Sequence, residues 1–143
     1  MTKYTLAVLN GMLPSELESV RDGDDEERRQ LSDTVISLIS MPTGWRVNAE
    51  YRGEFGGGFP VQVRWTPDEN GDFSLCLCSP SEMALTWSLF IVAHDGSVNR
   101  VLYHAGVLEP HLISDILKQI AVMRSFNCAP ATIAELLTGE DAA

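Results

Sequence analysis

The sequence predicts an α+β domain in which a five-stranded antiparallel meander sheet has one long helix before it and two helices after it. Apolar residues recur at helical spacing between residues 25 and 40 and again after residue 109. Between residues 45 and 105, apolar and polar side chains instead alternate, as they do along half-buried strands. Turn sequences divide that stretch into five segments, and consecutive hairpins make the order along the chain the simplest order in the sheet.

Length and composition favour one soluble domain over residues 1–143, with residues 1–23 loosely attached and residues 140–143 as a tail. A chain of 143 residues buries enough surface to fold without disulfides. No apolar run approaches the roughly 20 residues that span a bilayer, and the N-terminus lacks a convincing signal-peptide cleavage site. We therefore expect a cytoplasmic protein whose three cysteines are reduced.

The segment before the sheet is expected to end in the long helix. A short strand over residues 4–9 comes first, followed by a brief helix at Ser15, because Ser15 and Glu18 have the spacing of a capping box. Asp24 is expected to cap the helix over residues 25–40, whose acidic first turn also complements the helix dipole. The apolar stripe of this helix consists of Leu31, Val35, Leu38 and Ile39.

The second and third strands are expected to pair through a three-residue loop, Glu69-Asn70-Gly71. This loop sets Trp65 opposite Leu75 and Cys76 opposite Arg64, which keeps the apolar residues of both strands on one face. Beside an arginine, Cys76 is a candidate reactive thiol, although a small filler residue is the simpler interpretation. The five strands are expected to begin near Trp45, Phe59, Phe73, Ala84 and Val98.

The hairpin of the fourth and fifth strands is the expected centre of the fold. Its turn, Asp95-Gly96, favours type I′ geometry because both residue types tolerate positive φ. The turn sets Phe90 opposite Val101, Leu89 opposite Leu102 and Trp87 opposite His104. Because Leu89 and Phe90 point to opposite faces, the fourth strand needs apolar cover on both sides.

Two helices are expected after the sheet. Pro110 suits the first turn of a long helix, where its missing N–H would be unpaired in any case. A short helix follows Pro130, and Gly139 can close it. The apolar stripe of the long helix consists of Leu112, Ile113, Ile116, Leu117, Ile120 and Met123.

The first functional hypothesis concerns the side of the fourth strand that carries Phe90 and Val92. If the helices cover one side of the sheet, an apolar patch on the other needs a protein to cover it. We expect a non-enzymatic protein-binding module (an adaptor, inhibitor, immunity-type or secretion-chaperone-like protein) that acts as a homo-oligomer or binds another protein. The chain resembles the small acidic secretion chaperones in size, charge and element content, but lacks the helix that divides their strands. The predicted interface consists of Phe90, Val92, Val101 and Tyr103.

The alternative hypothesis is a small anionic ligand, such as a nucleotide, bound on an arginine-bearing sheet face. A glycine-rich loop would serve as a flexible lid. Such a loop cradles phosphate when a helix follows it, whereas here another strand is expected, and solvated arginines that cover apolar surface are the simpler interpretation. The residues of this hypothesis are Arg46, Arg52, Arg64, Arg100, Gly56, Gly57 and Gly58.

The sequence contains no pattern of useful specificity for catalysis or for a cofactor. His94 and His104 are expected at opposite ends of one hairpin, too far apart to share a metal. No candidate acid, base or nucleophile has an identifiable orienting partner. The net charge of −10 repels phosphate backbones. We therefore expect no catalytic residue, metal or cofactor, no general nucleic-acid binding and no membrane partner.

Overall fold

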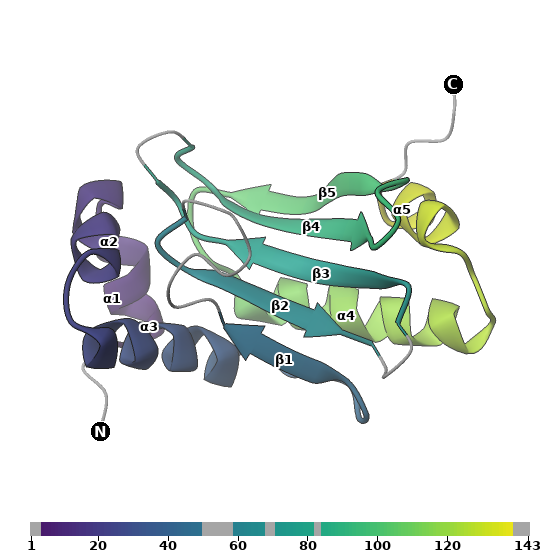
Figure 1. The fold of residues 1–143 in the computed structure, drawn as a ribbon, viewed down its shortest axis with the longest axis horizontal. Coiled ribbons are helices and arrows are strands. Elements are labelled where there is room, and N and C mark those ends of the chain that lie inside the picture. The colour runs from purple at the N-terminus through teal and green to yellow at the C-terminus, as the bar shows by residue number, and fades with distance from the viewer. Residues whose placement is uncertain (1–3, 50–58, 68–70, 82–83, 139–143) are drawn as a thin grey trace.

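A five-stranded antiparallel sheet forms the centre of the fold in a computed structural model that describes residues 4–49, 59–67, 71–81 and 84–138 (Figure 1). Neighbouring strands along the chain pair in the order β1-β2-β3-β4-β5, which confirms the predicted meander. The strands are β1 (Arg46–Ala49), β2 (Gln62–Thr66), β3 (Phe73–Cys78), β4 (Trp87–Ala93) and β5 (Asn99–Ala105).

Helices lie before and after the sheet, as the predicted α+β class requires, but two short helices precede the long one. Figure 1 shows α4 behind the sheet, α5 beside the β4–β5 turn, and α1 to α3 grouped at one end of the sheet. None of these helices is long and apolar enough to cross a membrane, among the residues that the structure describes. The helices are α1 (Leu6–Gly11), α2 (Pro14–Arg21), α3 (Asp25–Leu38), α4 (Pro110–Ser125) and α5 (Pro130–Thr138).

The strand predicted over residues 4–9 is wrong, because this segment begins helix α1. The Thr5 side chain caps α1 by accepting a hydrogen bond from the Val8 N–H at 3.2 Å. The helix turns Leu9, which is 1% exposed, into the hydrophobic core. Asn10 then joins α1 to the chain after β5, since its side chain donates to the Leu108 carbonyl at 3.0 Å and accepts from the Leu108 N–H at 2.6 Å.

Helix α2 has its N-cap at Leu13, two residues before the predicted cap at Ser15. Pro14 occupies the first turn, and the Glu16 carboxylate accepts a hydrogen bond from the Leu13 N–H at 2.9 Å. The Ser15 carbonyl instead accepts from the Ser19 hydroxyl. The predicted cap of α3 is confirmed, because the Asp24 side chain accepts from the Glu26 N–H at 3.1 Å.

One face of the sheet and the helices enclose the core. Trp65, Trp87 and Leu89 are among the fully buried residues, and they lie on this helix-covered face, as their alternation along the strands predicts. Helices α3, α4 and α5 contribute the facing side chains, among them Val35, Leu31, Ile113, Leu117, Ile120 and Ile133.

The predicted register of the second and third strands is confirmed. Trp65 pairs with Leu75, and Arg64 pairs with Cys76. The predicted loop residues Glu69 and Asn70 lie outside the described residues. Cys76 is 6% exposed and free of any disulfide, so its thiol is enclosed on the face opposite the helices.

The predicted hairpin of β4 and β5 is partly wrong. Phe90 pairs with Val101 as expected, but Leu102 is the extra residue of a β-bulge, so Leu89 pairs with Tyr103. Further along, His104 therefore pairs with Ser88 instead of Trp87.

The turn of this hairpin is also not type I′. Gly96 has a φ of 81°, whereas Asp95 does not have positive φ. The Ala93 carbonyl accepts from the Gly96 N–H at 3.0 Å, and the Asp95 carboxylate accepts from the Ser97 N–H at 2.9 Å and the Ser97 hydroxyl at 2.6 Å. These side-chain bonds favour a longer loop over the two-residue turn.

Asn127 ends α4 in the left-handed conformation, with a φ of 60°. Its N–H donates to the Arg124 carbonyl, and the Cys128 N–H donates to the Met123 carbonyl, which is the pattern of a Schellman cap. We expect Asn127→Ala to lower the free energy of unfolding by about 1 kcal/mol, because alanine tolerates this conformation less well than asparagine. Urea unfolding measures the change, and Asn127→Gly serves as the control that keeps the cap. An equal loss in both variants would contradict this account.

Candidate functional site

The face of the sheet opposite the core, here called the helix-free face, is the first candidate site. None of the helices lies over it in the described part of the chain (Figure 1). Its exposure rises from the middle of the sheet to the β5 edge, from 6% at Cys76 to 36% at Val101. The side chains that the strand registers place on it include Arg46, Asn48, Arg64, Ser74, Cys76, Phe90, Val92, Asn99, Val101 and His104.

Three of the four predicted interface residues form one apolar strip on this face. Phe90 pairs directly with Val101, and Val92 follows two residues along β4, so their side chains are neighbours on the sheet. Phe90 and Val92 are half-buried and Val101 is exposed. We call Phe90, Val92 and Val101 the apolar strip.

Tyr103, the fourth predicted interface residue, does not belong to the strip. The bulge at Leu102 reverses the alternation, so Tyr103 lies opposite Leu89 on the helix-covered face. Its phenol oxygen lies 3.0 Å from both the Val107 carbonyl and the Glu109 carboxylate. Partial burial, and then the hydrogen bond to Glu109, raise the pKa of Tyr103 to about 12. Tyr103 thus anchors the connection from β5 to α4.

The arginines of the anion hypothesis are divided between two faces. Arg46 and Arg64 lie diagonally on the helix-free face, because Arg46 pairs with Thr66 and Arg64 with Asn48. Arg100 pairs with Ile91 on the helix-covered face, where its guanidinium lies 3.5 Å from the Thr138 hydroxyl. The remaining residues of that hypothesis, Arg52, Gly56, Gly57 and Gly58, lie outside the described residues.

Ser74 and His94 form a pair that the sequence reasoning missed. The Ser74 hydroxyl lies 2.8 Å from His94 Nε2, near the end of the apolar strip. The strand register could have predicted this pair, because Ser74 pairs with Val92, and His94 follows Val92 by two residues on the same face. Ser74 is only 3% exposed, so the hydrogen bond satisfies a buried hydroxyl and the pair offers a substrate little access to the oxygen.

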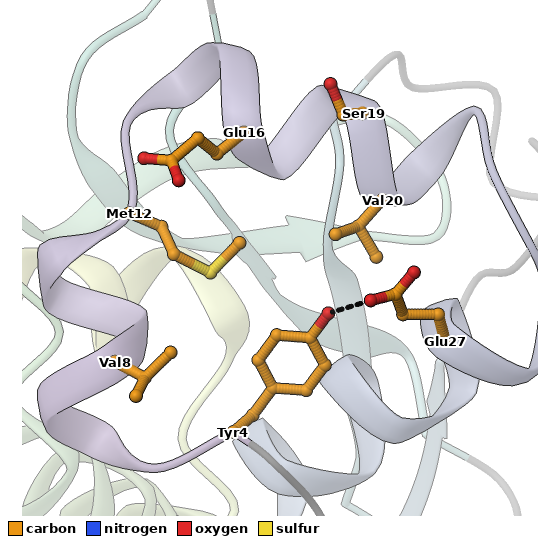
Figure 2. Close-up of a pocket in the computed structure, with 7 residues that line it drawn as sticks. All are labelled: Tyr4, Val8, Met12, Glu16, Ser19, Val20 and Glu27. Carbon is orange, nitrogen blue, oxygen red and sulfur yellow. Dashed lines mark hydrogen bonds between the residues drawn. The ribbon is translucent and has the colours of Figure 1, made fainter.

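A groove among α1, α2 and α3 is the second candidate site, and its residues are not among those predicted from the sequence. The groove has a volume of about 450 Å3. Figure 2 shows the apolar side chains of Val8, Met12 and Val20 and the ring of Tyr4 turned toward one another, with Glu16 and Glu27 at its margin. The Tyr4 hydroxyl donates to the Glu27 carboxylate at 3.0 Å. Val8 lies on helix α1, which replaces the predicted N-terminal strand, and Met12 follows it by about one helical turn, so both side chains lie on the same side of the segment.

These features define a small acidic α+β protein with two surfaces suited to docking another protein. The comparison with protein families narrows this class. Residues 3–141 match the family described as plasmid SOS inhibition protein (PsiB), and the chain therefore belongs to the PsiB family. The name of this family designates inhibitors, which supports the inhibitor among the predicted kinds of binding module and gives no support to the secretion-chaperone resemblance.

The raised pKa of Tyr103 predicts a specific dependence of stability on pH. The folded chain holds the phenol proton up to about pH 12, whereas the unfolded chain releases it near pH 10. The stabilisation is therefore complete below pH 10 and is lost as the pH rises toward 12. Urea unfolding at a series of pH values should show that the stability difference between wild type and Tyr103→Phe narrows across this interval. A constant difference would contradict the assignment.

Proposed function

We propose that this PsiB-family protein inhibits without catalysis, by binding a protein partner on its helix-free face. The observation that carries the proposal is the apolar strip of Phe90, Val92 and Val101 on the side of the sheet that no described helix covers. An apolar patch beside polar groups is typical of a protein interface. Membership of a family named for SOS inhibition supports a target in that system.

The surroundings of the strip favour a protein over a small ligand. Phe90, Val92 and Val101 lie on a sheet surface, with Asn99 and His104 as polar neighbours on the β5 side. An aromatic centre with a polar rim matches the anatomy of protein interfaces. A small anion would instead need several converging cations, and Arg100 is on the other face.

The same strip, which reaches the exposed β5 side of the sheet, is also the surface on which we expect self-association. β5 is the last strand in the sheet order and carries the exposed Val101. Two copies that pack strip against strip would form a symmetric interface, because each would present the same patch. We propose that any homodimer forms here, so that the partner and the second copy compete for one surface.

A lysine at Val101 should weaken inhibition. The charge would be desolvated in the interface, and a loss of affinity of about tenfold or more is expected. The measurement is expression from an SOS-responsive promoter in damaged cells that produce the wild type or Val101→Lys. The matched control is Val122→Lys, since Val122 is 58% exposed on α4 and lies away from the helix-free face. Equal inhibition by the wild type and both variants would show that the apolar strip is not the surface that binds the partner.

Light scattering after size exclusion tests self-association separately. If the wild type is a dimer through the strip, Val101→Lys should be a monomer at the same concentration and Val122→Lys should remain a dimer. A dimer that persists in Val101→Lys would place the self-contact elsewhere. A wild type that is monomeric at all concentrations tested would contradict self-association, and the strip would then serve only to bind the partner.

A further inference from the structure

We propose that the groove among α1, α2 and α3 binds a basic amphipathic helix of a partner protein. The groove is a second surface, made of different elements from the helix-free face, so the proposal does not depend on the apolar strip. The residues that line it are Tyr4, Val8, Met12, Glu16, Ser19, Val20 and Glu27.

The floor of the groove is apolar and partly accessible. Val20 and Tyr4 are buried at 8% and 4% exposure, whereas Val8 is 42% exposed. Met12 lies between them, half-buried, with its thioether directed into the groove (Figure 2). Methionine adapts its shape to what it contacts, which suits a surface that receives side chains from another molecule. Burial of this floor would stabilise a complex by the hydrophobic effect.

The margin of the groove is acidic. The Glu16 carboxylate accepts a hydrogen bond from the Leu13 N–H, and the Glu27 carboxylate accepts one from the Tyr4 hydroxyl. A carboxylate has acceptor capacity for several donors. Lysine or arginine side chains of a partner would find negatively charged acceptors in these carboxylates.

The surrounding segment strengthens this negative field. Residues 13–33 contain eight acidic and three basic side chains. The three arginines lie within 4.0 Å of carboxylates of the same segment, and none lines the groove: Arg21 contacts Glu18 and Asp22, Arg28 contacts Asp25, and Arg29 contacts Glu26. A basic partner would be attracted over a distance by the excess negative charge and held by the apolar floor at contact.

A helix fits this groove better than an extended strand does. A strand binds by extending a sheet, which requires a free edge of backbone N–H and carbonyl groups. The walls here are helices, whose backbone groups are largely bonded within each helix. Recognition must then occur through side chains, and an amphipathic helix presents an apolar stripe flanked by charged residues.

The test uses a fluorescent synthetic helix of leucine and lysine and a matched helix of leucine and glutamate. Fluorescence anisotropy with the full chain should show binding of the lysine helix that weakens with salt, and no comparable binding of the glutamate helix. Val8→Lys should weaken binding of the lysine helix by about tenfold. Ser19→Lys, at an exposed position on the margin, provides a second variant that leaves the floor intact.

Val122→Lys is the control, because it adds the same charge on α4 outside the groove. An equal loss of affinity in Val122→Lys would show a response to net charge alone and overturn the proposal. Equal binding of both synthetic helices, no binding of the lysine helix, or full affinity in both groove variants would also overturn it. Val101→Lys should bind the lysine helix normally, so failure of the groove and failure of the apolar strip are separately visible.

Discussion

The burial of one sheet face against the helices determines where the rest of this chain lies. Trp65, Trp87 and Leu89 are at most 1% exposed, and such side chains dominate the free energy gained by burial. Helices α4 and α5 lie against this face, and α3 contributes to the same core. These helices therefore do not cover the apolar strip on the opposite face, which is available to a partner. The position of the candidate interface is therefore a consequence of how the core is packed.

The single extra residue in β5 decides which side chains reach that interface. Without the bulge at Leu102, Tyr103 would follow Val101 onto the helix-free face. With it, Tyr103 packs against the core and contacts Glu109 at the start of α4. The bulge thus makes the apolar patch on the helix-free face smaller, and it lets Tyr103 connect the sheet to α4. A bulged edge strand is also a poorer template for unintended pairing.

The sequence predicts the parts of the fold that regular alternation determines. The paired registers around Trp65 and Phe90 follow from which residues must be buried together. The bulge at Leu102 is not predicted, because nothing in the alternation of β5 marks one residue as extra. The helix at Leu6 is missed for another reason, since six residues fit either period and the bonds of Asn10 to Leu108, 98 residues away, are invisible in local sequence.

That misread N-terminal segment matters for function as well as for fold. As a strand, it would place Val8 and Tyr4 according to a period of two. As a helix packed on α2 and α3, it brings Val8, Met12 and Val20 around one groove beside two glutamates. The apolar strip lies on strands that are adjacent in the sequence, so a site of that kind can be predicted from the alternation of its residues. The groove is built from elements that meet only through tertiary contacts, so its residues can be recognised only once the structure is known.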